Sequence, residues 1–304
     1  MEKTIKHIKK ILIAVDFTEK SDNAIQLGIR MAQRHKAKII LFHNYNNFYI
    51  IDRTGRQVIG KETISSNYEQ AEKSLTEVKL MYQQQYPDIP FQSFIGNETI
   101  VNSINHQISS ASVDLVIIGT SGNQGLRELV LGSVSYQLLN NVHCPILLIP
   151  ADSNIYHFRK ILVPVRVLEE LNEKIELAEC IAEKNNGIIK VLGISHVKDE
   201  SKMKEAFVSV NHLLSSNNTD FKSSFSVTDD KATEISEISK EDSFDLIVLN
   251  NQDEQSWKSI FSENFLKQII NNTSIPLLFY RNIYKEAEIN QENTGYDITL
   301  PCPG

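Results

Sequence analysis

Cysteine is scarce in this 304-residue chain, and its three cysteines, Cys144, Cys180 and Cys302, lie far apart. Their number is odd, and their spacing fits neither a structural zinc site nor a disulfide framework. Few and scattered thiols are typical of proteins that stay in a reducing compartment. We therefore expect a cytoplasmic protein without structural disulfides.

Long apolar runs are also lacking, and no stretch approaches the ~20 residues of a membrane-spanning helix. The chain begins with four lysines between residues 3 and 10, followed by an apolar run over residues 11–15 that Asp16 ends. A signal peptide needs ~7–15 apolar residues at this place. We interpret the start as the solvated approach to a strand, and we expect no membrane partner.

An excess of positive charge is missing too, because 31 basic and 38 acidic residues give a net charge of -7. Nucleic-acid binding depends on neutralising phosphates with Lys and Arg, so we expect no nucleic-acid partner. The sequence has no Gly-x4-Gly-Lys-Ser/Thr loop, which argues against a P-loop ATPase. No spacing indicates a Ser–His–Asp or Cys–His–Asp arrangement.

The sequence does contain an internal repeat. Three blocks recur in the same order: residues 10–16 at 160–166, 114–120 at 245–251, and 144–149 at 275–280. The offset is 150 for the first block (10 to 160) and 131 for the others (114 to 245), so the second copy lacks 19 residues, 150 minus 131. We interpret the chain as a duplication with a first domain at 1–152, a second at 158–281, and a polar tail at 282–304.

Apolar runs alternate with segments of helical periodicity in both copies, which favours an α/β fold. In the first copy we expect strands at 8–15, 38–43, 91–95, 115–118 and 146–149, and helices at 21–35, 64–82, 99–110 and 134–139. In the second copy we expect strands near Ile161, Ile189, Phe221, Leu246 and Leu277. Each domain is thus predicted to be a mostly parallel five-stranded sheet of Rossmann type, with helices on both faces.

Small and polar residues follow three of the expected strands in the first copy. Asp16 follows the first strand, Asn44 follows the second, and Gly119 follows the fourth. Gly119 and Gly122 are separated by two residues, and nine residues separate Gly122 from Gly132-Ser133. Glycines let the backbone approach a ligand, and a helix that begins near Ser133 would favour an anion. These positions meet at the carboxyl ends of parallel strands, where such sheets bind ligands.

Plainer readings of the same residues stay open at this point. The glycines are also turn residues, and Ser133 is also a helix N-cap. Asp16 is also suited to the amino end of a helix. His43 is expected to pack beneath the site as a neutral ring.

The pattern of Gly119, Gly122, Gly132 and Ser133 resembles the ATP-binding signature of the universal stress protein family. Residues 11–16 resemble the first strand of that family, and residues 143–149 resemble its last strand. The resemblance covers nearly all of the first copy and, more loosely, the second. It implies an adenine-nucleotide α-hydrolase-like fold and ATP as the ligand.

By that resemblance, Asp16 lies near adenosine or near a bound metal, Mg²⁺ or Mn²⁺. Backbone around Asn44 meets adenine, Gly119 lines the ribose, and the phosphates lie on Gly122, Gly132 and Ser133. Phe17 departs from the small residue that often follows the aspartate, which puts the size of the pocket mouth in question.

The second copy lacks these residues. Asp16 corresponds to Arg166, and Gly119, Gly122, Gly132 and Ser133 correspond to Asn250, Asp253, Glu263 and Asn264. Two of the three replaced glycines are carboxylates, which repel phosphate. We therefore expect one ATP per chain. The resemblance implies a stress-response regulator that binds it, and because no base to activate water is evident we expect at most weak ATPase activity. A slow ATP-hydrolysing enzyme and a purely structural pseudo-dimer are the alternatives.

Three expectations concern assembly and loops. The resemblance implies that the two domains pair through their last strands, so the strands at 146–149 and 277–280 are expected to pair antiparallel and cover two sheet edges. A homodimer of chains stays open. Residues 45–60, most of which the second copy lacks, are either a lid over the nucleotide or a loop packed on the neighbouring domain.

Overall fold

The computed structural model describes residues 7–45, 61–122, 129–130, 133–150, 153–166, 171–250 and 265–281. We call residues 7–150 the N-terminal half and residues 153–281 the C-terminal half. The N-terminal half contains β1 (Lys10–Ala14), α1 (Glu19–His35), β2 (Lys38–Asn44), α2 (Lys61–Gln85), β3 (Phe91–Gly96), α3 (Ile100–Ala111), β4 (Leu115–Gly122), β5 (Leu129–Val130), α4 (Ser133–Asn141) and β6 (Ile146–Pro150). The C-terminal half contains β7 (Lys160–Val165), α5 (Leu171–Asn185), β8 (Ile188–Ser195), a 3-10 turn (Val197–Asp199), α6 (Glu200–Ser216), β9 (Phe221–Val227), α7 (Lys231–Glu241), β10 (Leu246–Asn250), α8 (Phe265–Asn272) and β11 (Leu277–Tyr280).

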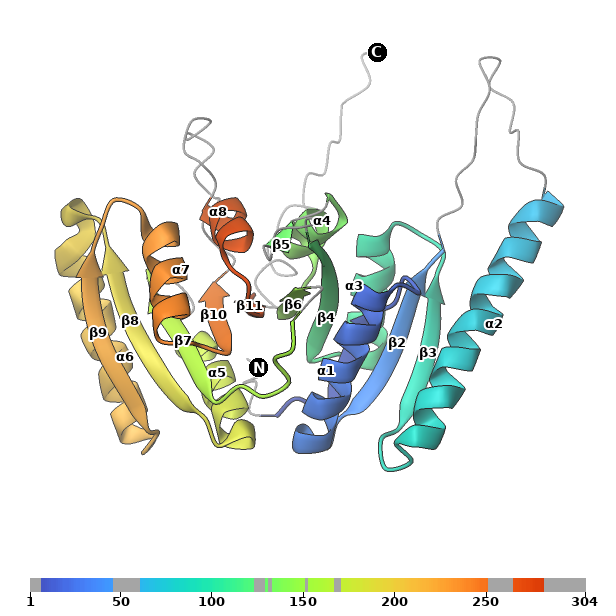
Figure 1. The fold of residues 1–304 in the computed structure, drawn as a ribbon, viewed down its shortest axis with the longest axis horizontal. Helices are drawn as coiled ribbons and strands as arrows, with labels where there is room; N and C mark the ends of the chain where they lie inside the picture. Colours follow the sequence, from blue (N-terminus) through green and yellow to red (C-terminus); the bar gives the residue numbers. More distant parts are fainter. Residues whose placement is uncertain are drawn as a thin grey trace, which may run out of the picture.

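The two halves share one sheet with the strand order β3-β2-β1-β4-β6-β11-β10-β7-β8-β9 (Figure 1). Neighbours along this path are parallel within each half, and β6 pairs antiparallel with β11 at the centre, where Leu147 lies opposite Leu278. This is the strand pairing that the sequence predicted for residues 146–149 and 277–280. The α/β fold class and the mostly parallel sheet are confirmed.

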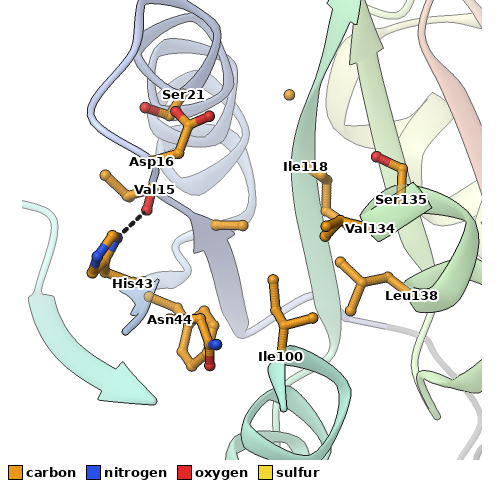
Figure 2. Close-up of a pocket in the computed structure, with 13 residues that line it drawn as sticks. Val15, Asp16, Ser21, His43, Asn44, Ile100, Ile118, Val134, Ser135 and Leu138 are labelled. Atoms are coloured by element: carbon orange, nitrogen blue, oxygen red, sulfur yellow. Dashed lines mark hydrogen bonds between the residues drawn. The ribbon is translucent and has the colours of Figure 1, made fainter. Parts of the chain in front are cut away.

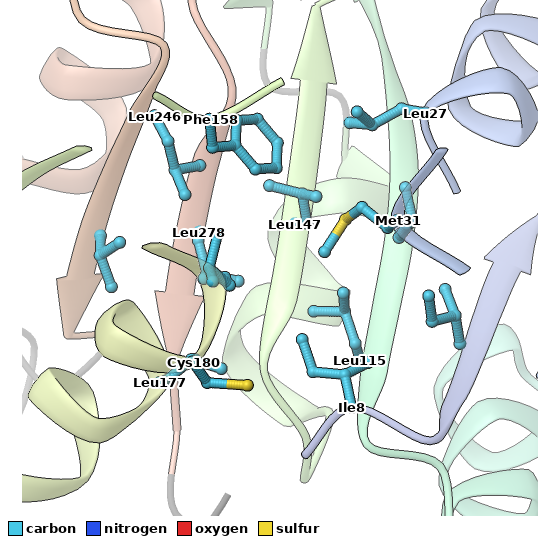
Figure 3. Close-up of a cluster of buried hydrophobic side chains, with 14 of the residues drawn as sticks. Ile8, Leu27, Met31, Leu115, Leu147, Phe158, Leu177, Cys180, Leu246 and Leu278 are labelled. Carbon is cyan, nitrogen blue, oxygen red and sulfur yellow. The ribbon is translucent and has the colours of Figure 1, made fainter. Parts of the chain in front are cut away.

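The strands are apolar on both faces because helices cover both. Leu12 and Ile13 are adjacent in β1 and point to opposite faces, and both are fully buried. One face packs against α1, α2, α5 and α6, and the other packs against α3, α4, α7 and α8. On the first face the core runs across both halves, where Leu147 and Met31 lie near Leu278 and Phe158 (Figure 3).

One aspartate in each half fixes the amino end of its first strand. The Asp114 carboxylate accepts the backbone N–H groups of Lys9 and Lys10, at 2.8 and 3.0 Å. Asp245, 131 positions later, accepts the equivalent pair from residues 159 and 160, at 2.8 and 2.9 Å. Equivalent positions of the repeat therefore make the same pair of hydrogen bonds in both halves.

The fourth strand of the N-terminal half is longer than predicted, because it continues from residue 118 to Gly122 and pairs there with β5. The two residues of β5 are too few to show an alternating pattern, so periodicity could not predict this strand. Residues 46–60, which contain most of the expected lid or packing loop, and the tail at 282–304 lie outside the described residues.

Candidate functional site

A pocket of about 360 Å³ opens at the carboxyl ends of β1, β2 and β4 (Figure 2). It lies beside the point where the strand order reverses between β1 and β4, which is where open α/β sheets bind their ligands. Its size is within the range of small-molecule sites. The lining residues are Ala14, Val15, Asp16, Ser21, Phe42, His43, Asn44, Ile100, Ile118, Gly119, Val134, Ser135 and Leu138.

Asp16 stands directly after β1, at the rim of the pocket. Its carboxylate accepts the backbone N–H of Thr18 at 3.1 Å and the Thr18 hydroxyl at 2.5 Å. Burial alone would raise the pKa of Asp16, but the hydrogen bonds from Thr18 and Ser21 outweigh it, and the pKa lies below its ordinary value. Asp16 therefore presents a negative charge to the pocket at neutral pH, as a hydroxyl acceptor or a cation ligand would.

The turn after β1 is strained at Phe17, whose φ is 62°. A bulky residue seldom adopts this left-handed conformation, and here the turn is held by the bonds from Thr18 to Asp16. The Phe17 ring lies 4.6 Å from the ring of His43, centroid to centroid. Phe17 thus packs against the wall that His43 forms and is not among the lining residues.

His43 and Asn44 at the end of β2 form a second wall. His43 Nδ1 lies 2.7 Å from the Val15 carbonyl oxygen (Figure 2). Since a carbonyl only accepts, the proton is on Nδ1. The Asn44 side chain donates to the Glu98 carbonyl at 3.2 Å. His43 was expected beneath the site, and it lies in the wall of the pocket.

Gly119 lines the pocket and also packs closely against the start of α1. A Cβ at this position would lie 2.5 Å from the backbone carbonyl oxygen of Lys20. A backbone atom cannot yield as a flexible side chain can, so any other residue would push the start of α1 away from β4. Gly119 is therefore required for close packing as well as for an open pocket.

The third wall comes from α4, which begins at Ser133. Val134, Ser135 and Leu138 face Asp16 and Ser21 across the pocket (Figure 2). The free N–H groups of the first turn of α4 make this end suitable for an anion. Gly122 is the last residue of β4. Gly132 lies outside the described residues, and so do the side chains of Ser121 and Ser133.

Sequence reasoning missed much of the apolar lining. Ile100 and Leu138 follow helical periodicity and were indistinguishable from core positions. Ser135 is buried and follows Ser133 by two positions, so its place in the first turn of α4 was the available signal.

The corresponding edge of the C-terminal half is built differently. Arg166 replaces Asp16, is 4% exposed, and donates from Nη2 to the carbonyl oxygen of Asn250 at 2.9 Å. Burial lowers the pKa of Arg166 to about 9. Its guanidinium lies over the ring of Phe265, 3.9 Å from the centroid. Fully buried Lys174 donates to the carbonyl of Pro164 at 2.6 Å, and burial followed by the charge of Arg166 brings its pKa well below the ordinary value.

The described residues show neither a cluster of metal ligands nor a membrane-spanning helix. They contain no group of three or more His, Cys, Asp or Glu residues that could hold a metal ion. Among the same residues, no helix combines the length and apolarity that a membrane crossing requires.

Comparison with known proteins identifies the N-terminal half. Residues 7–150 match the sequence model of the Universal stress protein family. Residues 7–150 therefore form a universal stress protein domain. A universal stress protein of Mycobacterium tuberculosis is 26% identical over 137 residues, which are 45% of this chain and 44% of that protein. The chain thus spans less than half the length of this relative.

Two further similarities extend the comparison. A universal stress protein of Methanocaldococcus jannaschii is 27% identical over 143 residues, covering 46% of this chain and 81% of that protein. The solved structure of a universal stress protein from Archaeoglobus fulgidus superposes on 90% of this chain and 98% of its own, with a TM-score of 0.69 and 16% identity. That similarity shows that the fold of both halves together occurs in a universal stress protein.

Proposed function

We propose that this universal stress protein binds one ATP in the pocket of its N-terminal half and acts as a nucleotide-dependent regulator in a stress response. Asp16 lies next to adenosine or the metal, backbone at Asn44 meets adenine, and Gly119 lines the ribose. The triphosphate lies against the amino end of α4, on Gly122, Gly132 and Ser133.

The convergence of Asp16, Asn44 and Gly119 in one pocket is the observation that carries this proposal. Asn44 and Gly119 lie near the ends of β2 and β4, and Asp16 follows β1. The pocket is polar at Asp16 and Ser21 and apolar at Ile100, where a flat base is accommodated. The first turn of α4 supplies free N–H groups at the opposite side, as a phosphate chain requires.

A divalent cation, Mg²⁺ or Mn²⁺, would be held jointly by Asp16 and the phosphate oxygens. The lowered pKa of Asp16 supports this role, because the carboxylate stays charged at neutral pH. The cation would screen the repulsion between Asp16 and the phosphates. Calorimetric titration with ATP should therefore give tighter binding with Mg²⁺ or Mn²⁺ than with a chelator.

We further propose that 1–152 and 158–281 are two domains of one duplicated chain that mimic a dimer of single domains. The symmetrical strand order about the β6–β11 pair supports this proposal. Arg166 supports the proposal that only the N-terminal half binds nucleotide, because it occupies the edge of the C-terminal half that corresponds to the nucleotide site.

Titration of the purified chain with ATP tests the proposed function. We expect saturation at one nucleotide per chain and recovery of intact ATP after incubation. Saturation at two would show that the C-terminal half also binds. Release of ADP over many turnovers would support the slow hydrolase instead, and an absence of binding would favour a purely structural role.

A further inference from the structure

Arg281, directly after the last strand of the C-terminal half, reaches the helix that begins at the nucleotide pocket. Its Nη1 donates to the carbonyl oxygen of Leu139 at 3.4 Å and to that of Asn140. Both carbonyls belong to the last turn of α4, where helix carbonyls lack partners within the helix. A cation there also complements the negative end of the helix dipole.

A second contact reaches the same wall of the pocket. Helix α8 of the C-terminal half packs against β5 of the N-terminal half, and the two lie side by side in Figure 1. The two residues of β5 pair with Ser121 and Gly122 at the end of β4. Two β4 residues just before this pair, Ile118 and Gly119, line the pocket, and α4 also lines it. The C-terminal half therefore contacts α4 directly, through Arg281, and β4 through β5.

The contact of Arg281 with the Leu139 and Asn140 carbonyls, which we call the arginine clasp, has no counterpart in the opposite direction. Position 150 corresponds to position 281 by the offset of 131 and is Pro150, whose side chain has no donor. The N-terminal half therefore cannot return the same contact to α8. In addition, α8 is itself held at its start, since the Arg166 guanidinium lies over Phe265.

We infer that the C-terminal half is the positioning element for the phosphate-binding side of the nucleotide pocket, with Arg281 as the residue that fixes α4. This inference rests on the proposed function. Arg281 lies at the far end of α4 from Ser133 and is not a lining residue, so it acts on the ligand only through α4. It should affect the part of the ligand that α4 contacts, the phosphates, and leave adenosine untouched.

The test compares ATP with adenosine as probes on the full chain. Arg281→Ala should weaken ATP binding about tenfold in calorimetry while the affinity for labelled adenosine, measured by equilibrium dialysis, changes less than twofold. Arg281→Lys retains a donor and a charge, and should recover part of the loss.

Arg34→Ala is the matched control. Arg34 donates to the Tyr156 carbonyl at 2.8 Å, near the end of α1 that lies away from the pocket. It should reduce stability about as much as Arg281→Ala and leave both affinities unchanged. Wild-type ATP affinity in Arg281→Ala, or an equal loss of ATP and adenosine affinity, would overturn the inference.

Hydrogen exchange separates this inference from the proposed function. In the ligand-free protein, Arg281→Ala should speed amide exchange over residues 129–141, and Arg34→Ala should not. If wild-type chain binds no ATP, the proposed function fails, and with it the role of Arg281 in nucleotide binding. Unchanged exchange over 129–141 would overturn the clasp itself.

Discussion

The carboxyl ends of β1 and β4 frame an open pocket, whereas those of β7 and β10 are bridged by a buried arginine. Asp16 and Gly119 lie on either side of the pocket in the N-terminal half. At the corresponding positions, the Arg166 guanidinium donates directly to the Asn250 carbonyl. One scaffold therefore carries either a cavity or a packed polar bridge, and side-chain size and charge at two strand ends decide between them.

The first helix of each half shows the same contrast. Ala24 of α1 is small and buried, and its counterpart in α5, 150 positions later, is Lys174. The Lys174 amine fills space near the strand ends and contacts the Pro164 carbonyl. Two buried basic side chains, Arg166 and Lys174, therefore fill the strand ends of the C-terminal half, where the N-terminal half has a pocket. Their burial carries a desolvation cost.

The largest expected effect comes from replacing Gly132, which the proposed function assigns to the phosphates. Gly132→Val should weaken ATP binding at least about a hundredfold, because a branched side chain blocks the close approach of backbone to phosphate. Calorimetry measures the affinity, and circular dichroism checks the fold. The counterpart in the C-terminal half, Glu263→Val, should leave the affinity unchanged. Equal effects of the two variants would erase the distinction between the halves.

Gly119→Ala should lower the free energy of unfolding by about 2–3 kcal/mol, because the new Cβ meets the Lys20 backbone at 2.5 Å. Chemical denaturation measures the loss. Gly28→Ala is the control: its Cβ would meet the flexible end of Ile13, and alanine favours the helix, so the change should stay within about 1 kcal/mol. A neutral Gly119→Ala would mean that the glycine serves the ligand alone.

Acid should lower the free energy of unfolding through protonation of His35, at the end of α1. Burial, followed by the charge of Arg34, lowers the pKa of His35 to about 4, and its buried Nε2 has no hydrogen-bond partner among the described residues. Between about pH 6.5 and pH 4 the unfolded chain therefore binds a proton that the native chain does not. Stability falls as the pH falls through this window, by about 2 kcal/mol from this residue.

The counterpart of His35 provides the matched variant. Asn185 ends α5, accepts the Phe158 N–H at 3.1 Å and donates to the Ile181 carbonyl at 2.8 Å. His35→Asn should remove this part of the acid sensitivity while stability at pH 7 changes little. Denaturation series at pH 7 and pH 4.5 measure the difference, and identical pH profiles for variant and wild type would contradict the assignment.

The smallest effect is expected at the second buried cation. Lys174→Met keeps the apolar stem and removes the buried amine with its desolvation cost, so the free energy of unfolding at pH 7 should rise by about 1 kcal/mol. Lys204→Met, at a lysine whose side chain is 56% exposed, should change it by less than about 0.5 kcal/mol. A large loss of stability in Lys174→Met would show that the amine stabilises the closed edge.

The sequence by itself determined the fold class, the succession of strands and helices, and the residues offered to a ligand. Apolar runs and helical periodicity depend on local spacing, so residues 21–35 or 91–95 could be recognised without knowing their neighbours. The repeat offsets identified 146–149 and 277–280 as equivalent strands, and the family resemblance implied that they pair at the centre of the sheet.

Only the tertiary structure decided which side chains meet. Nothing local distinguishes Ile100 or Leu138, which line the pocket, from the core residues one turn away. The demand for glycine at position 119 comes from Lys20, about a hundred residues earlier in the chain, and the bond from Arg281 to Leu139 spans 142 residues. Such contacts depend on how helices and strands pack after they form, and no spacing along the sequence records them.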